Sequence, residues 1–244
     1  AVVAVDPTRR RGGGALLVHR IRMNSITEGT VYFRSLATRS TGGVLPPALD
    51  DVTAACRAAG YDLIIVETPG IGQGDAAITE HVYVSLYVMT PEYGAASQLE
   101  KIDMLDFADV VAINKYERRG AEDARRDVAR QIVRNREAFG SSWQDMPVFG
   151  TSAARFDDDG VTALYHALRS DLGRRGLREF DGHLPTVDTK VSTGLTSVLP
   201  RGRERYLAEI AETVRDYHAE TGRLAGVARE AQHLATTAGL LGAE

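Results

Sequence analysis

The sequence predicts an α/β fold with a mainly parallel, doubly wound sheet and a C-terminal helical extension. Three observations lead to this prediction. Short strands that are apolar throughout alternate with helical segments, which is typical of a parallel sheet covered on both faces. Polar loops follow directly after several of these strands. From about residue 203 to 241 the pattern is helical, with no further strand.

The first part of the chain predicts the following elements in order. Residues 1–5 form an apolar strand, and residues 31–35 are an added edge strand. Residues 46–59 form a helix, because two prolines stand at its start and Gly60 stands just past its end. Residues 61–66 form the clearest strand, because their second half is β-branched and apolar.

The alternation continues through the middle of the chain. The expected order is strand 82–89, helix 97–106, strand 109–113, helix 121–139, strand 147–149 and helix 161–173. The helix 121–139 is strongly charged and amphipathic, whereas the strand 109–113 is apolar along its whole length after the first residue. We therefore expect the strand 109–113 to lie in the core and the helix 121–139 to cover it.

Two regions follow from this pattern: a domain over residues 1–176, and a linker with a long helix over residues 177–244. In the helix, Leu207, Ile210 and Val214 begin an apolar stripe with 3–4 spacing. Two interpretations stay open. The helix folds onto its own sheet, or it is a connector that docks on another part of a protein.

Composition excludes several functional classes. The net charge of −4 argues against a general nucleic-acid binder, because binding phosphates requires a basic surface. The longest mainly apolar stretch, Val82–Met89, is far shorter than the roughly 20 residues of a membrane span. The single cysteine, Cys56, forms no internal disulfide and fits a reducing compartment, so we expect a cytoplasmic protein.

Four polar loops stand where predicted strands end, and ligands of open α/β sheets bind at that edge. The loops are Asp6–Gly14, Glu67–Asp75, Asn114–Glu117 and Thr151–Ala153. Each has an ordinary structural interpretation, since an acidic residue after a strand is often a helix cap and a glycine-rich loop is often a turn. All four in this order favour a nucleotide-binding site.

The first two loops suit a metal ion and a terminal phosphate. Asp6 and Glu67 offer carboxylates to a hard divalent cation such as Mg²⁺. Gly70, Gly72 and Gly74 let the backbone approach a γ-phosphate closely and rearrange when it leaves.

The other two loops suit a guanine base. The carboxylate of Glu117 is placed to accept two hydrogen bonds from the ring N–H and the amino group, while the stem of Lys115 covers the ring face. The backbone N–H of Ala153, next to Ser152, is placed to donate to the guanine carbonyl oxygen. With Asn114, these residues form the predicted GTP/GDP-binding set.

Several stretches also resemble a known family. They are Asp6–Leu17, Ile21–Asn24, Glu67–Asp75, Pro91–Asp103 and Asn114–Glu117. They resemble the GTPase chaperones of adenosylcobalamin-dependent acyl-CoA mutases. The stretches Thr68–Asp75 and Asp6–Gly14 favour the form fused to isobutyryl-CoA mutase over the free-standing methylmalonyl-CoA mutase-associated GTPase.

The resemblance implies a P-loop NTPase-like fold and a GTPase that gates cofactor loading and protection of a mutase. It implies GTP or GDP with Mg²⁺ as ligands, and catalytic roles for Glu67, Gly70 and Gln73. Adenosylcobalamin would be bound by other domains. Acyl-CoA mutase and cobalamin-binding domains would be partners, in cis if fused, and the intact protein would be a homodimer. An alternative is a scaffold or interdomain connector that does not hydrolyse GTP.

The sequence departs from the family in three places. The P-loop pattern G-x-x-x-x-G-K-[ST] does not occur, so we expect a fragment that begins inside a domain and hydrolyses GTP negligibly alone. His19 stands where family members have an aspartate implied as a metal ligand. Glu117 stands where the motif usually has an aspartate, so its carboxylate lies one methylene further out.

Overall fold

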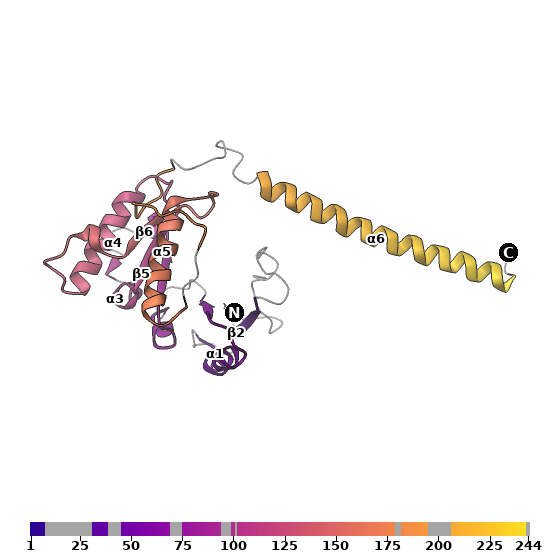
Figure 1. The fold of residues 1–244 in the computed structure, drawn as a ribbon, viewed down its shortest axis with the longest axis horizontal. Helices are drawn as coiled ribbons and strands as arrows, with labels where there is room; N and C mark the ends of the chain where they lie inside the picture. The colour runs from indigo at the N-terminus through magenta and orange to yellow at the C-terminus, as the bar shows by residue number, and fades with distance from the viewer. Residues whose placement is uncertain are drawn as a thin grey trace. The chain divides into compact units, whose positions relative to one another are not determined.

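The computed structural model describes residues 1–7, 31–38, 45–68, 75–93, 99–100, 102–178, 182–194 and 206–242. The chain forms two compact units, Ala1–Thr196 and Ser197–Glu244 (Figure 1). Residues 182–194, part of the predicted linker, belong to the first unit. The functional boundary at 176/177 stays a prediction.

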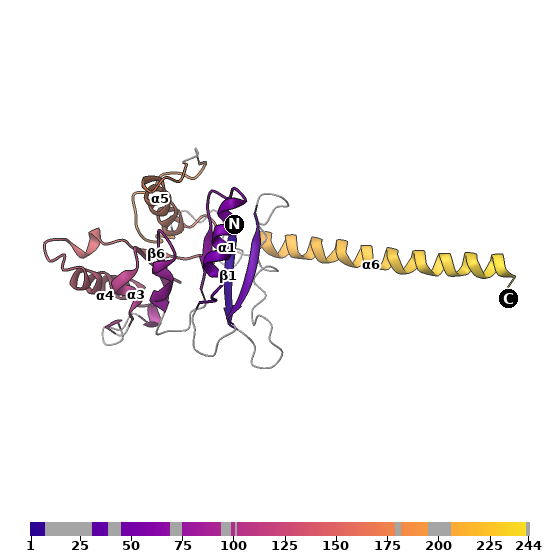
Figure 2. The same cartoon turned by 90° about the horizontal axis from the view of Figure 1, so that it is seen from below.

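One parallel sheet contains β1 (Val2–Pro7), β2 (Phe33–Thr38) and β3 (Ile65–Glu67) in the order β2-β1-β3. The expected edge strand is therefore present as β2. The helix α1 (Leu49–Ala58) packs beside β1 (Figure 2). The cluster under it is made by the buried side chains of Val3, Leu49, Cys56 and Ile78. Val3 belongs to β1, Leu49 and Cys56 belong to α1, and Ile78 belongs to the 3₁₀ turn Asp75–Glu80.

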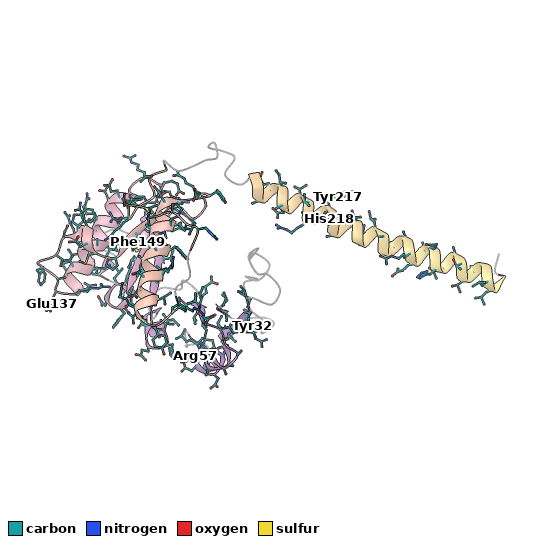
Figure 3. All side chains as sticks on the ribbon, viewed as in Figure 1. Tyr32, Arg57, Glu137, Phe149, Tyr217 and His218 are labelled. Carbon is teal, nitrogen blue, oxygen red and sulfur yellow. The ribbon has the colours of Figure 1, made fainter. Side chains whose placement is uncertain are left out.

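A second parallel sheet contains β4 (Leu86–Met89), β5 (Val110–Asn114) and β6 (Val148–Thr151) in the order β4-β5-β6. The largest core cluster joins this sheet to α3 (Met104–Phe107) and α4 (Ala121–Asn135). A smaller cluster, with Phe149 and Ala163, joins it to α5 (Asp159–Arg174) (Figure 3). Short 3₁₀ turns lie at Asp75–Glu80, Pro91–Tyr93 and Trp143–Asp145.

The predicted parallel α/β fold is confirmed, with two differences in detail. The strands expected at 61–66 and 82–89 are shorter, since only Ile65–Glu67 and Leu86–Met89 pair. The described strands form two three-stranded sheets instead of one continuous sheet, because β3 and β4 each pair on one side only. Both expose an apolar side chain, Ile65 and Val88, although apolar runs of this kind predict buried strands.

The second unit is the helix α6 (Tyr206–Leu241), within the range expected from the sequence. Its apolar stripe is exposed at Ile210, Val214 and Tyr217, the last of which makes an edge contact with His218 (Figure 3). Within the described residues, no helix combines the length and apolarity that crossing a membrane requires.

Candidate functional site

Asn114 joins two of the predicted loops at the carboxyl end of the second sheet. It ends β5, whose four preceding residues are buried. Its Oδ1 accepts a hydrogen bond from the backbone N–H of Ala153 at 3.1 Å and a longer one from Thr151 Oγ1 at 3.4 Å. The backbone N–H of Tyr116 donates to the carbonyl oxygen of Thr151 at 3.0 Å. The loops 114–117 and 151–153 are therefore held together.

The two charged residues of the first loop are exposed beside this junction. Lys115 has φ of +59°, in the left-handed region that non-glycine residues rarely occupy. Its carbonyl oxygen accepts from the N–H of Arg118 at 2.9 Å, which closes a turn around Glu117. Such backbone strain clusters at ligand-binding sites, and the side chains of Lys115 and Glu117 stay accessible to a ligand.

An ion pair fastens the same turn to the 3₁₀ turn Pro91–Tyr93. Arg118 Nη1 donates to Glu92 Oε1, and both side chains are about half exposed. A hydrogen bond from Thr90, then one from the backbone N–H of Glu92 itself, then one from Arg118 lower the pKa of Glu92 to about 2. Because this pKa is depressed, the stabilisation that Glu92 gives the folded chain is present above its ordinary pKa near 4.5. This stabilisation is lost as the pH falls toward 2.

Tyr116, the variable residue of the motif, packs on the neighbouring strand. A Cβ on Gly150 would lie 2.4 Å from two atoms of the Tyr116 ring, so only glycine permits this contact. Burial of the half-buried ring raises the pKa of Tyr116. The loop after β5 is thus fixed by packing as well as by hydrogen bonds.

The backbone of Ser152 is held by Asp158, which was not among the predicted site residues. Asp158 is only 5% exposed, and its Oδ1 accepts from the backbone N–H groups of Ser152 at 3.2 Å and Val161 at 2.9 Å. The second bond makes Asp158 the N-cap of α5. An aspartate just before a predicted helix is the signal that could have found it.

Two of the predicted metal and catalytic residues, Asp6 and Glu67, belong to the first sheet. Glu67 ends β3 and is partly exposed, and its backbone is paired with Ala4 of β1. Asp6 follows Ala4 by two residues in the same strand, so both acidic positions lie at the carboxyl edge of this sheet. His19, Gly70 and Gln73 lie outside the described residues. Among the residues that are described, no cluster of three histidine, cysteine or acidic side chains is placed to hold a metal.

A cavity of about 330 Å³ lies at the opposite end of the second sheet from Asn114. Its lining includes Asp109 and Val110, where β5 begins, and Pro147, which precedes β6. Arg136, Arg174, Arg175 and Lys190 also line it, and Asp109 and Asp171 pair with arginines there. This cavity is separate from the predicted base-binding loops.

The first unit is a parallel α/β domain with polar loops at the carboxyl ends of its strands. Domains of this class bind their ligands at that edge of the sheet. The model of the family "Methylmalonyl Co-A mutase-associated GTPase MeaB" matches residues 1–177. The chain belongs to this family, which confirms the resemblance found in the sequence.

Individual relatives agree with this assignment. The fused isobutyryl-CoA mutase of Nocardia farcinica is 67% identical over 96% of this chain, and that of Cupriavidus metallidurans is 59% identical over 96%. The match covers 22% and 21% of those proteins, so the chain spans about a fifth of their length. A protein of Pyrococcus horikoshii that carries GTPase in its name is 29% identical over 87% of this chain and 68% of its own length.

Proposed function

We propose that residues 1–177 form a guanine-nucleotide-binding GTPase domain that serves an adenosylcobalamin-dependent acyl-CoA mutase. The observation that carries the proposal is the hydrogen bond from the Ala153 N–H to Asn114 Oδ1. It brings together the two loops whose residues suit a guanine base, in a chain whose family consists of mutase-associated GTPases.

Base recognition needs a small set of groups from these loops. The exposed carboxylate of Glu117 accepts from the ring N–H and the amino group of guanine, and the stem of Lys115 covers one face of the ring. Asn114 supports the backbone around Ala153, whose N–H turns to the guanine carbonyl oxygen when the base is bound. Adenine carries an amino group at that position, so a backbone donor there disfavours it.

We assign phosphate and metal binding to the carboxyl edge of the first sheet. Asp6 and Glu67 supply the hard oxygen donors that Mg²⁺ prefers, and Mg²⁺ would offset the charge of the phosphates. Gly70 and Gln73 follow Glu67 in the loop that would approach the γ-phosphate and the attacking water. His19 would be a weaker ligand than an aspartate, because imidazole suits transition metals better than Mg²⁺.

The mutase context comes from the relatives. We propose that this domain gates cofactor loading and protection in a fused protein that interconverts isobutyryl-CoA and n-butyryl-CoA. Adenosylcobalamin and the acyl-CoA would be held by other domains in cis, in a cytoplasmic homodimer. The exposed stripe of α6 supports its role as a connector to a mutase domain. A scaffold without turnover is the alternative, and it predicts no GTP hydrolysis even in a longer protein that carries a phosphate loop.

The first test measures base recognition directly. The 244-residue chain is titrated with GDP and with ADP, and binding is followed by the NMR shifts of the Asn114 and Ala153 amides, which report even millimolar affinity. We expect GDP to bind more tightly.

Glu117→Ala should weaken GDP binding about tenfold and Glu117→Asp should strengthen it, because a hydrogen bond to a charged group contributes roughly 1.5–3 kcal/mol. Glu122→Ala, an exposed glutamate on α4, is the control. Unchanged GDP affinity in both Glu117 variants would exclude this role.

A second test concerns the metal. In a longer protein that carries these residues together with a phosphate loop, His19→Asp should lower the Mg²⁺ concentration needed for half-maximal GTP turnover. The added carboxylate is an oxygen ligand for a hard cation. Asp6→Ala and Glu67→Ala should each impair turnover. Identical Mg²⁺ dependence and rates for His19→Asp and the parent would mean that position 19 does not reach the metal.

A further inference from the structure

A segment that follows α5 covers the free edge of β6, next to the predicted base-binding loop. Val191 forms a parallel bridge with Gly150. The N–H of Gly150 donates to the carbonyl oxygen of Lys190 at 2.9 Å, and the N–H of Ser192 donates to the carbonyl oxygen of Gly150 at 2.8 Å. Residues 190–192 therefore act as a short additional strand, which we call the edge segment.

Lys190 anchors the near end of the edge segment. Its Nζ donates to the carbonyl oxygens of Gln144 at 2.9 Å, Asp145 at 3.2 Å and Met146 at 3.2 Å. Partial burial lowers the pKa of Lys190, with a further lowering from the charge of Arg125. Three acceptors occupy all three of its donors, so the function of Lys190 is to hold the segment in place.

Ser192 extends from this anchored segment toward Ser152. Its hydroxyl donates to Asp158 Oδ2 and lies 3.0 Å from Ser152 Oγ. The other carboxylate oxygen of Asp158 accepts from the Ser152 N–H at 3.2 Å. Ser192 and Asp158 thus hold both the backbone and the side chain of Ser152, which is 1% exposed.

The next residue after this buried serine is Ala153, which is exposed and carries the N–H assigned to the base. The direction of this N–H is set by the peptide unit that joins Ser152 to Ala153. On one side this unit is restrained by Asn114, through the 3.1 Å hydrogen bond, and on the other by the contacts of Ser152. When a base displaces Asn114 from the Ala153 N–H, two restraints on this unit stay in place: the contacts of Ser152 and the hydrogen bond from the Arg155 N–H to the Ser152 carbonyl oxygen at 2.8 Å.

We propose that Ser192 is a positioning residue for base recognition. Through Asp158 and Ser152 it fixes the Ala153 N–H in the direction that favours a purine with a carbonyl oxygen at its six-position over one with an amino group there. The inference rests on the proposed function. It adds that a residue 40 positions from Ser152, outside the family's match to residues 1–177, contributes to the choice of base.

The experiment compares three variants of the 244-residue chain. Ser192→Ala removes the hydroxyl, Ser192→Thr keeps it, and Ser170→Ala removes an exposed hydroxyl from α5 as a matched control. In the absence of nucleotide, we expect Ser192→Ala to raise the hydrogen-exchange rates of the Ser152 and Ala153 amides about tenfold, the effect of losing roughly 1.4 kcal/mol of local stability. Ser192→Thr and Ser170→Ala should exchange like the parent.

The second readout is the ratio of GDP to ADP affinity, measured by NMR titration. We expect Ser192→Ala to lower this ratio about fivefold through weaker GDP binding, and Ser192→Thr to restore it. Partial unfolding would weaken both ligands equally and would leave the ratio unchanged. If the parent prefers GDP and Ser192→Ala shows parental exchange rates and the parental ratio, the positioning role is overturned. If the parent itself shows no preference, the proposed function fails first.

Discussion

Asp158→Ala is expected to lower the free energy of unfolding of the first unit by about 3–4 kcal/mol. The change removes the N-cap of α5, which contributes about 1 kcal/mol. It also leaves two donors at a buried site without their acceptor, the N–H of Ser152 and the hydroxyl of Ser192, and each such loss costs roughly 1–3 kcal/mol. Urea unfolding followed by the fluorescence of Trp143 measures this loss, because Trp143 is the only tryptophan and packs against the core of the second sheet.

The control is Asp188→Ala, the same change at an exposed aspartate of the same unit. Its effect should stay within about 0.5 kcal/mol, as for most surface substitutions. If Asp158→Ala and Asp188→Ala shifted the unfolding midpoint equally, the hydrogen-bond network around Ser152 would contribute nothing to stability.

Gly160→Ala is expected to destabilise the first unit by about 3 kcal/mol, the upper range for overpacking a dense site. Gly160 lies in the first turn of α5, where propensity alone predicts that alanine would stabilise by about 1 kcal/mol. The close packing reverses this sign. A Cβ at residue 160 would lie 2.0 Å from the carbonyl oxygen of Gly150 and 2.6 Å from the backbone nitrogen of Ser192. These two atoms are the acceptor and donor of one of the two backbone hydrogen bonds that hold the edge segment on β6.

The matched control is Gly222→Ala in α6, where a Cβ would meet nothing within 4 Å. There propensity acts alone, so circular dichroism should show a helix that melts at a higher temperature. A Gly160→Ala chain with parental stability by Trp143 fluorescence would mean that the backbone around Gly150 moves apart at little cost.

Much of the fold followed from local patterns in the sequence. The apolar run 110–113 forms a buried strand, as its composition predicts, and the charged amphipathic pattern from Ala121 forms α4. Strand ends could be located because each apolar run stops at a polar residue such as Asn114. Since carboxyl ends of parallel strands meet at one edge, the sequence also predicted that the loops at 114–117 and 151–153 would be neighbours.

The sequence was less informative where an element depends on its neighbours. Residues 61–64 have strand-forming composition, but only Ile65–Glu67 pair, because a strand needs a partner along its whole length. Likewise the helix predicted to Phe139 ends at Asn135, and Glu137 then takes a positive φ of 52°. Boundaries of this kind are set by the contacts of the folded chain and not by composition.

The sequence by itself determined the parallel α/β class, the family and the residue types suited to guanine, because these depend on local order and on short motifs. Only the tertiary structure decided which groups hold the Ala153 N–H. Asn114 accepts from the Ala153 N–H, whereas Asp158 and Ser192 contact the backbone N–H and the hydroxyl of Ser152. The three come from separate segments, and Ser192 is 40 residues away from Ser152. A single serine hydroxyl carries no sequence signal of such a role, since its function arises when folding places it within 3.0 Å of Ser152 Oγ.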